Sequence, residues 1–495
     1  MRVVWTDRSL ESSDAALVAV LARGKGGAAL AALDRLSGGS LGAQAKEEAF
    51  DGKEGRSLEW RGDLGGRTRR VVVVGLGDRP SGAAGFREAV ARAFGAAVRL
   101  RAATAAIYVD GDDAETARRR AAWAIEALHL AGYRFDAYRS KRQDQSGPKR
   151  FAVGVHAADG RRAGAAAKTA AGEATARAEA TLLCRDLVNE PANARGPAQF
   201  AAAARRVARE KGLACRVWNA GELERRGMRL ILAVSAGSTA EPRLVHLTYS
   251  PKKKARRRVA LVGKGVTFDS GGLCLKPAKS MLEMKTDMAG GAIVLAALSA
   301  AAALRLDVEI HGIIPLAENG VGPSASRPGD VVKGYSGTTV EIVNTDCEGR
   351  MILADALAYA CELGVDEIVD FATLTGACPV SLGPTRAGFL TADDALAARY
   401  EAAAAAAGEL VWRLPLADEL DRDLRSDVAD VKNQGGRFGG TITAALFLKR
   451  FVKPSIPWLH VDIAGPARAE AATPLCPRGG SGYGVLTCLE LLGNG

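Results

Sequence analysis

The sequence contains few histidines and lacks the motifs that identify several common classes of enzyme. It has five histidines in 495 residues and no HExxH segment, which excludes a zinc peptidase of the histidine type. A GxxxxGK[ST] phosphate loop is also missing, which argues against a P-loop nucleotide site.

The cysteines and apolar segments exclude further classes. All eight cysteines lie at or after Cys184, irregularly spaced and without a CxxC pair, which argues for reduced thiols and against a disulfide framework. The longest apolar run, Met288 to Leu304, is rich in Gly, Ala and Ser. It predicts a buried helix, because a membrane span needs about 20 strongly apolar residues. Asp7 and Arg8 interrupt the apolar stretch that a signal peptide needs, so no export is expected.

Acidic residues are outnumbered by basic ones, which leaves a net charge of +11. Basic residues gather between 252 and 258 and again between 118 and 120. Such clusters could contact nucleic-acid phosphates. Because no groove-reading motif or interleaved aromatic residue accompanies them, a solvated loop is the favoured interpretation, and a nucleic-acid partner stays an alternative that is not favoured.

The pattern of strands and helices predicts an α/β protein of two domains. Residues 1–160 alternate short apolar strands with Ala- and Arg-rich helices, which is typical of an α/β domain. Residues 161–186 predict one long linking helix, and residues 187–495 form the larger remainder. The GLGD segment, Gly75 to Asp78, is interpreted as a plain turn between strand and helix and not as a cofactor loop.

The residues suited to chemistry concentrate in the larger domain. The segment VALVGKGVTFDSGG predicts a buried strand that runs into a glycine-rich turn, and it carries Lys264 and Asp269. Asp287 follows just before the alanine-rich helix, and NTDCEGR carries Asp346 and Glu348, which an extended segment would place on one face. Neighbouring carboxylates repel one another unless a proton, an arginine or a metal ion lies between them.

A metal centre is the interpretation that these acids favour. Four carboxylates suffice for two divalent ions if some of them bridge, and oxygen ligands suit Zn, Mn, Mg or Co without choosing among them. Lys264 is costly to bury as a charge, so it is expected to be either a neutral metal ligand or the ion-pair partner of one of the acids. Any single Asp of this set, taken alone, is more often a helix cap, a turn residue or a surface charge than a metal ligand.

Several blocks resemble the leucyl aminopeptidases, the cytosol aminopeptidases of family M17. The blocks VGKGVTFDSGG, MKTDMAG, NTDCEGR and ATLTGA occur in the order and at the separations typical of that family. The resemblance extends over the C-terminal two-thirds, from LVNEPAN to SGYGV, and is loose over the first 160 residues. It implies a macro-like N-terminal α/β domain and a larger catalytic α/β/α domain with a mixed, mostly parallel sheet.

The resemblance also implies the site residues. A tight metal site would use Lys264, Asp269, Asp287 and Glu348, and a more exchangeable one would use Asp269, Asp346 and Glu348. The cofactors would be two divalent ions per subunit, Mn or Zn, with Mg or Co also admissible. Lys276 would stabilise the oxyanion, and Arg350 would hold a bicarbonate that acts as general base.

The implied activity is that of a metal-dependent aminopeptidase that uses a hydroxide bridging the two metals. It would release Leu and other uncharged N-terminal residues from peptides. The pocket for the first residue would be lined by Met284, Thr373, Gly376, Ala464 and Ala467. Some relatives carry Met at the position of Ala467, so a roomier pocket is expected. The family further implies a homohexamer in the cytoplasm without a membrane partner.

Two departures from the family pattern and two rival functions complete the expectations. Cys347 stands where Ala is usual, and alternation along the segment points its side chain away from the metals. Gly291 likewise replaces an Ala, with an expected small cost in helix stability.

The first rival function is a DNA-binding scaffold on the same fold. The second, a dinuclear phosphoesterase, is disfavoured by the lysine ligand and by the family blocks.

Overall fold

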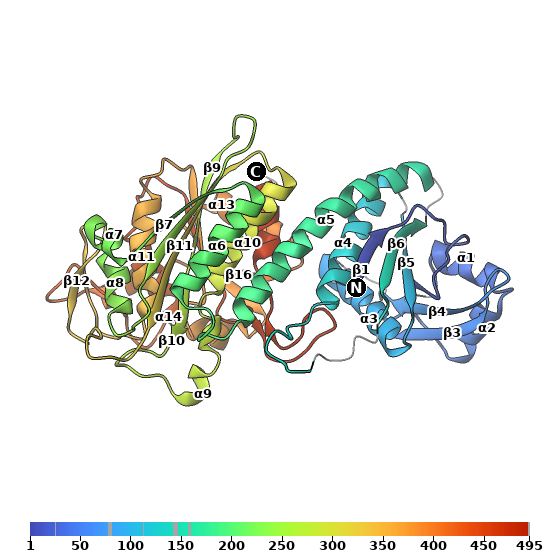
Figure 1. The fold of residues 1–495 in the computed structure, drawn as a ribbon, viewed down its shortest axis with the longest axis horizontal. Helices are drawn as coiled ribbons and strands as arrows, with labels where there is room; N and C mark the ends of the chain where they lie inside the picture. The colour runs from blue at the N-terminus through green and yellow to red at the C-terminus, as the bar shows by residue number, and fades with distance from the viewer. Residues whose placement is uncertain (25, 78–81, 112, 142–146, 157–159, 494–495) are drawn as a thin grey trace. The chain divides into compact units, whose positions relative to one another are not determined.

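The chain divides within one long helix, α5 (Gly160–Asn189), which covers the range predicted for the linking helix. One unit comprises Met1–Glu179 and Ala471–Pro477, and the other comprises Ala180–Glu470 and Arg478–Gly495. The structure, a computed structural model, describes residues 1–24, 26–77, 82–111, 113–141, 147–156 and 160–493 (Figure 1). The last residue of the GLGD turn lies outside the described residues.

The N-terminal unit is built on a six-stranded sheet with the order β1-β6-β5-β2-β4-β3, parallel except for the β3–β4 pair. Its central strand LVAVLA is buried throughout, so alternate side chains face two separate cores, one against α3 and α4 and the other against α1 and α2. Its elements are β1 (Arg2–Trp5), β2 (Leu17–Ala22), α1 (Ala28–Leu36), α2 (Ser40–Glu47), β3 (Ser57–Asp63), β4 (Thr68–Gly75), α3 (Ala83–Arg99), β5 (Thr104–Asp110), α4 (Ala114–Ala131) and β6 (Arg150–His156).

The C-terminal unit is built on a nine-stranded sheet with the order β16-β15-β18-β14-β9-β11-β8-β7, in which β10 also pairs with β11. The pairs β18–β14, β14–β9, β9–β11 and β10–β11 are parallel, whereas β15–β18, β11–β8 and β8–β7 are antiparallel. The strands are β7 (Ala214–Trp218), β8 (Arg243–Tyr249), β9 (Arg258–Gly263), β10 (Gly265–Asp269), β11 (Glu309–Asn319), β14 (Glu367–Ala372), β15 (Arg386–Leu390), β16 (Leu410–Arg413) and β18 (Trp458–Asp462). The predicted α/β class with a mixed, mostly parallel sheet is confirmed.

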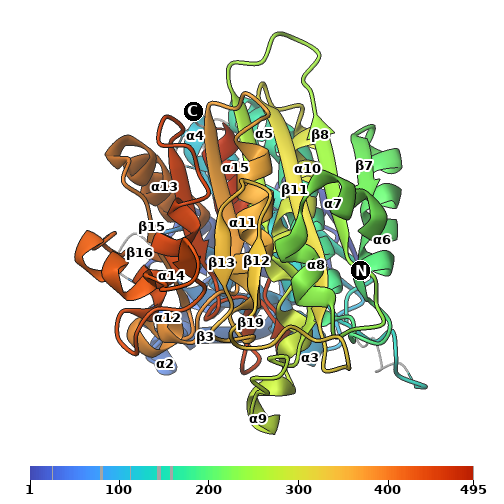
Figure 2. The same ribbon diagram turned by 90° about the vertical axis from the view of Figure 1, so that its left-hand side faces the viewer.

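Helices cover both faces of this sheet because its strands are apolar on both sides. Val259 and Leu261 of β9 face the core under α6, α10, α13 and α15, whereas Ala260 and Val262 face the core under α7, α8, α11 and α14 (Figure 2). These helices are α6 (Pro197–Lys211), α7 (Ala220–Arg226), α8 (Arg229–Ser235), α10 (Ala289–Leu304), α11 (Glu348–Ala360), α13 (Asp394–Ala407), α14 (Gly440–Lys449) and α15 (Val485–Gly493).

Shorter elements connect this framework. They are α9 (Ala278–Met281), η1 (Met284–Thr286), β12 (Val331–Lys333), β13 (Thr339–Glu341), α12 (Ala377–Leu382), η2 (Asp418–Leu424), β17 (Val431–Lys432), β19 (Arg468–Ala469) and β20 (Gly479–Gly480).

The apolar run predicted as a buried helix is α10. One stretch of the described chain, Met284–Leu304, is long and apolar enough to cross a membrane by composition, but 83% of its most apolar window is buried inside the protein. Every residue of α10 from Ala289 to Ala301 is buried. The run is therefore a core helix, as predicted.

Candidate active site

Lys264 lies at the junction between β9 and β10, held there by its own backbone. Its N–H donates to the carbonyl of Phe371 on β14 at 3.0 Å, and its carbonyl accepts from the N–H of Gly291 in α10 at 2.8 Å. The side chain is only 3% exposed. The carboxyl ends of the parallel strands thus deliver a buried amine to the edge of the sheet where α/β proteins place their sites.

Glycines make room for this lysine and its neighbours. A Cβ added to Gly349 would lie 2.4 Å from Lys264 Cε and 2.6 Å from its Nζ. A Cβ on Gly291 would lie 2.6 Å from Ile314 Cγ2. The close packing of α10 on β11 is therefore a reason for glycine at position 291 in addition to the expected small cost in helix stability.

The four acids come from different elements. Asp269 ends β10, Asp287 lies between η1 and α10, and Glu348 is the first residue of α11; these three are 2%, 4% and 2% exposed. Asp346 precedes α11 and is half-buried. The prediction of an extended segment around Asp346 is wrong: the chain turns there, with the Asp346 N–H donating to Asn344 Oδ1 at 2.8 Å, before the helix begins.

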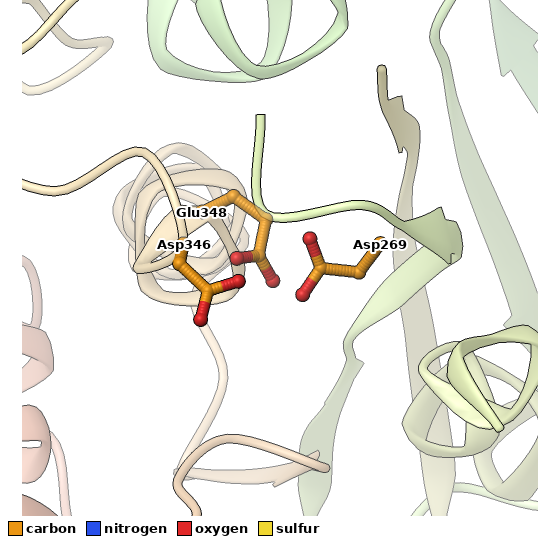
Figure 3. Close-up of side chains that lie close together, drawn as sticks. All are labelled: Asp269, Asp346 and Glu348. Atoms are coloured by element: carbon orange, nitrogen blue, oxygen red, sulfur yellow. The ribbon is translucent and has the colours of Figure 1, made fainter. Parts of the chain in front are cut away.

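This turn still brings the carboxylates together. One ligand oxygen each from Asp269, Asp346 and Glu348 lie within 4.8 Å of one another, and the three side chains point towards a common centre (Figure 3). So close a set of carboxylates requires cations between them.

Two lysines supply that charge. Lys264 Nζ lies 2.8 Å from Asp287 Oδ1 and 2.9 Å from Glu348 Oε1. Lys276 Nζ lies 2.9 Å from Asp269 Oδ2 and 2.6 Å from Asp346 Oδ1. The structure therefore shows the lysine–carboxylate pairing that the sequence left open as an alternative to metal ligation.

The pKa values follow from burial and crowding. Burial, and then the charge of Asp269, raises the pKa of Glu348 to about 8. Burial also raises the pKa of Asp287 to about 6, against the lowering effect of Lys264. Burial alone would lower the pKa of Lys264, but Asp287 and Glu348 outweigh it, and the pKa is raised. Groups with raised pKa values release protons when a metal binds to them.

Two buried oxygens show that the site fits divalent cations. Asp287 Oδ2 and Glu348 Oε2 have no hydrogen-bond partner within the part of the chain that the structure describes. A buried carboxylate oxygen without a partner is costly, and metal coordination would satisfy it. Oxygen ligands suit Mn, Mg and Zn.

Supporting residues orient the acids. Asn319, at the end of β11, donates from Nδ2 to Asp269 Oδ1 at 2.8 Å and to the carbonyl of Thr345 at 3.0 Å. Thr373 donates from Oγ1 to Asp287 Oδ1 at 2.6 Å, and its carbonyl accepts from Lys264. Asn319 was not predicted from the sequence. The available signal was a polar residue that follows the apolar run IIPLA at a strand end.

Arg350 and Cys347 flank the acids on α11. Arg350 is 6% exposed; its Nη1 donates to the carbonyl of Asn433 at 2.8 Å, and its Nε has no partner within the described ranges. Cys347 is half-buried at the N-cap of α11, and burial raises the pKa of its thiol. Its thiol is not among the ligand atoms that converge with Asp269.

The residues predicted for the first-residue pocket lie on loops around the site. Met284 opens η1 beside Asp287, Thr373 follows β14, and Gly376 precedes α12. Ala464 and Ala467 follow β18, half-buried and buried respectively. Thr373 is joined to the acids by its hydrogen bond; the shared pocket stays a prediction.

The basic run lies between β8 and β9. Lys252, Lys253 and Lys254 are exposed, whereas Arg257 is half-buried and its Nη1 lies 2.9 Å from Glu367 Oε1. The Arg258 N–H donates to Asp366 Oδ2 at 2.7 Å. Arg257 thus pairs within the fold, whereas the three lysines, Arg256 and Arg258 are exposed.

Fold and site together define a class of protein: an α/β enzyme whose carboxylates and lysines converge at strand ends, as a divalent-metal centre requires. Family models give the particular family. The catalytic domain of the cytosol aminopeptidase family matches residues 182–489, and its N-terminal domain matches residues 17–142. The chain belongs to this family of metal-dependent aminopeptidases, which confirms the resemblance noted in the sequence.

Individual relatives agree over most of the chain. Probable cytosol aminopeptidases of Syntrophotalea carbinolica and Aquifex aeolicus are 42% and 41% identical, over 93% and 90% of this chain and 93% and 89% of theirs. A mutant of tomato leucine aminopeptidase is similar in structure, with a TM-score of 0.89 and 34% identity over 100% of this chain and 96% of that one. The bottromycin maturation enzyme BotP in complex with Mn has a TM-score of 0.85 and 40% identity over 97% and 99%.

Proposed function

We propose that the protein is a dinuclear aminopeptidase that releases leucine and other uncharged N-terminal residues. The observation that carries the proposal is the pair of buried, unpartnered oxygens, Asp287 Oδ2 and Glu348 Oε2, within a cluster of acids. Lys264, Asp269, Asp287 and Glu348 would hold one divalent ion, and Asp269, Asp346 and Glu348 the other. The Mn complex of BotP supports manganese as one of the ions.

The bound ions would supply Lewis acidity and a bridging hydroxide at neutral pH. The chain's own residues supply the rest. Lys276, freed from Asp269 and Asp346 as those acids turn to the ions, would donate a hydrogen bond to the developing oxyanion of the scissile carbonyl. Arg350, whose buried Nε lacks a partner among the described residues, would hold bicarbonate as general base. All the nearby carboxylates are committed to metal, which leaves this role open for an anion.

Substrate choice rests on the small side chains around the site. Ala464 and Ala467 leave room for an uncharged side chain, and Met284 would provide an apolar contact. The similarity to tomato leucine aminopeptidase supports leucine as one substrate. We further propose a cytoplasmic location, which the family name supports, and a homohexamer, which rests on the family resemblance alone.

The decisive experiment compares leucine p-nitroanilide with its N-acetylated form after chelation, with Mn, Zn, Co or Mg added back singly. We expect metal-dependent cleavage of the free-amine substrate only, because the α-amine would bind at the metal centre. Equal cleavage of both substrates would contradict the exopeptidase assignment, and no cleavage with any metal would contradict the enzyme itself.

The exposed lysines 252–254 are the observation that keeps a nucleic-acid partner as the second candidate. Glu348→Ala should abolish peptidase activity and leave DNA affinity unchanged. Replacing Lys252, Lys253 and Lys254 together by Ala should do the reverse, measured by electrophoretic mobility shift at two salt concentrations. DNA binding by the triple variant equal to that of the unmodified protein would exclude the lysines as the contact surface, and no DNA binding by the unmodified protein would eliminate this second function.

A further inference from the structure

A pair of histidines lies at the other end of the strand that carries Asn319. His311 is the third residue of β11 and His246 lies on β8; in the antiparallel register His311 is opposite Thr248 and diagonal to His246. His246 Nε2 and His311 Nδ1 are 3.0 Å apart. Eight residues of extended strand separate His311 from Asn319, about 26 Å at 3.3 Å per residue, so the pair is remote from the acid cluster.

Each imidazole is held by a partner on its outer nitrogen. His311 Nε2 lies 3.2 Å from Glu309 Oε1, and His246 Nδ1 lies 3.0 Å from the Tyr359 hydroxyl on α11. The Tyr359 ring in turn packs edge-on against Trp218, with centroids 5.0 Å apart. Metal-binding histidines are oriented in this way, with the second nitrogen bonded to a carboxylate or another fixed polar group.

The tautomers of the pair permit metal binding without loss of a proton. The Glu309 carboxylate only accepts, so a neutral His311 carries its proton on Nε2 and presents the Nδ1 lone pair to His246. Without metal, Tyr359 donates to His246 Nδ1, and His246 Nε2–H donates to His311. If the His246 proton moves from Nε2 to Nδ1, the Nδ1–H donates a hydrogen bond to the Tyr359 oxygen, because a hydroxyl can either donate or accept. Both inner lone pairs are then free.

The spacing suits a tetrahedral ion. Two Zn–N bonds of about 2.05 Å at the tetrahedral angle separate the nitrogens by about 3.3 Å, which is close to the 3.0 Å observed. The Thr248 hydroxyl lies 3.5 Å from His246 Nε2 and could contribute an oxygen. The His311 side chain is 13% exposed, which leaves an approach from solvent.

We infer that His246 and His311 form a second, independent metal site that binds a borderline divalent ion, Zn²⁺ or Cu²⁺, with solvent completing the coordination. Imidazole nitrogen favours Zn and Cu, whereas an oxygen-rich site suits Mn and Mg. The chain would therefore carry two sites of different ligand chemistry, at opposite ends of β11.

Zinc counting tests the inference on the full-length protein. After dialysis against buffered zinc, metal analysis should give one more zinc ion per chain for the unmodified protein than for His246→Gln or His311→Gln. His156→Gln, a histidine elsewhere in the chain, is the matched control and should keep the full count. Equal zinc in the unmodified protein and in both pair variants, each with an unchanged circular dichroism spectrum, would overturn the site.

A second variant and a spectroscopic signal guard against misfolding. Glu309→Gln removes only the negative charge of the outer partner and should weaken zinc binding about tenfold. The ligands proposed for the acid cluster include no histidine, so imidazole nitrogen couplings in pulsed EPR of added Cu²⁺ should come from this pair and disappear in His311→Gln. Couplings that persist there, or zinc affinity unchanged in Glu309→Gln, would show that the pair is a hydrogen-bonded contact only.

Discussion

Gly349→Ala is expected to disable the proposed metal centre while leaving the fold intact. The new methyl carbon would lie 2.4 Å from Lys264 Cε and 2.9 Å from its Cδ, whereas carbon atoms in contact are about 3.5–4.0 Å apart. The lysine side chain must therefore move by about 1 Å. Glu348 is the first residue of α11. A shift of α11 in place of the lysine would therefore displace a second proposed ligand.

The size of the effect depends on whether the lysine side chain or the helix moves. The clashing atoms belong to the far end of a long side chain, so the cost in stability should fall within the about 1–3 kcal/mol of ordinary overpacking. Misplacing a reacting group by about 1 Å can cost about 10²-fold in rate. We therefore expect kcat for leucine p-nitroanilide to fall about a hundredfold and one metal ion per chain to be lost, with a small change in melting temperature.

Gly95→Ala is the matched control. Gly95 lies within α3, and a Cβ there would meet nothing within 4 Å. Alanine in an open helical position should raise the free energy of unfolding by up to about 1 kcal/mol and leave the metal content unchanged. Full metal content and full kcat in Gly349→Ala would refute the close approach of Lys264 as the reason for glycine.

Three further outcomes are expected. Metal affinity should rise with pH, because the protons of Asp287, with a pKa of about 6, of Glu348, with a pKa of about 8, and of Lys264 must leave when metal binds. Calorimetry in two buffers of different ionisation enthalpy should detect this proton release. A metal affinity that does not change with pH would contradict the prediction. Asn319→Ala should lower metal affinity about 10–100-fold by freeing Asp269, as equilibrium dialysis would show, whereas unchanged affinity would remove Asn319 from the site. Asp355→Ala should lower the free energy of unfolding in urea by about 3 kcal/mol or more, because the buried Asp355 carboxylate accepts hydrogen bonds from the N–H groups of Leu230, Ile231 and Tyr335. A decrease of less than about 1 kcal/mol would be inconsistent with those hydrogen bonds.

The α/β class and the position of Lys264 and Asp269 at strand ends could be predicted because they depend on local patterns. Apolar runs such as VALVG, followed by glycine, predict a buried strand and its turn, and a strand end is where chemistry collects in such folds. The run Met288–Leu304 is recognisable as a core helix by its small residues alone. The resemblance of the family blocks then implies the proposed ligands, because the order and spacing of the blocks are properties of the sequence.

The tertiary structure decided which residues meet. Lys264 and Glu348 are 84 positions apart in the sequence, and only the packing of α11 beside the end of β9 brings them within 2.9 Å. The same holds for Asn319 with Asp269, and for His246 with His311, since neither pair shares a local pattern. The turn at Asp346, which the sequence misassigned as extended, is held by Asn344 in a local hydrogen bond that alternation does not reveal. Periodicity reports which face of an element is buried, but the order of strands in the sheet determines what that face touches.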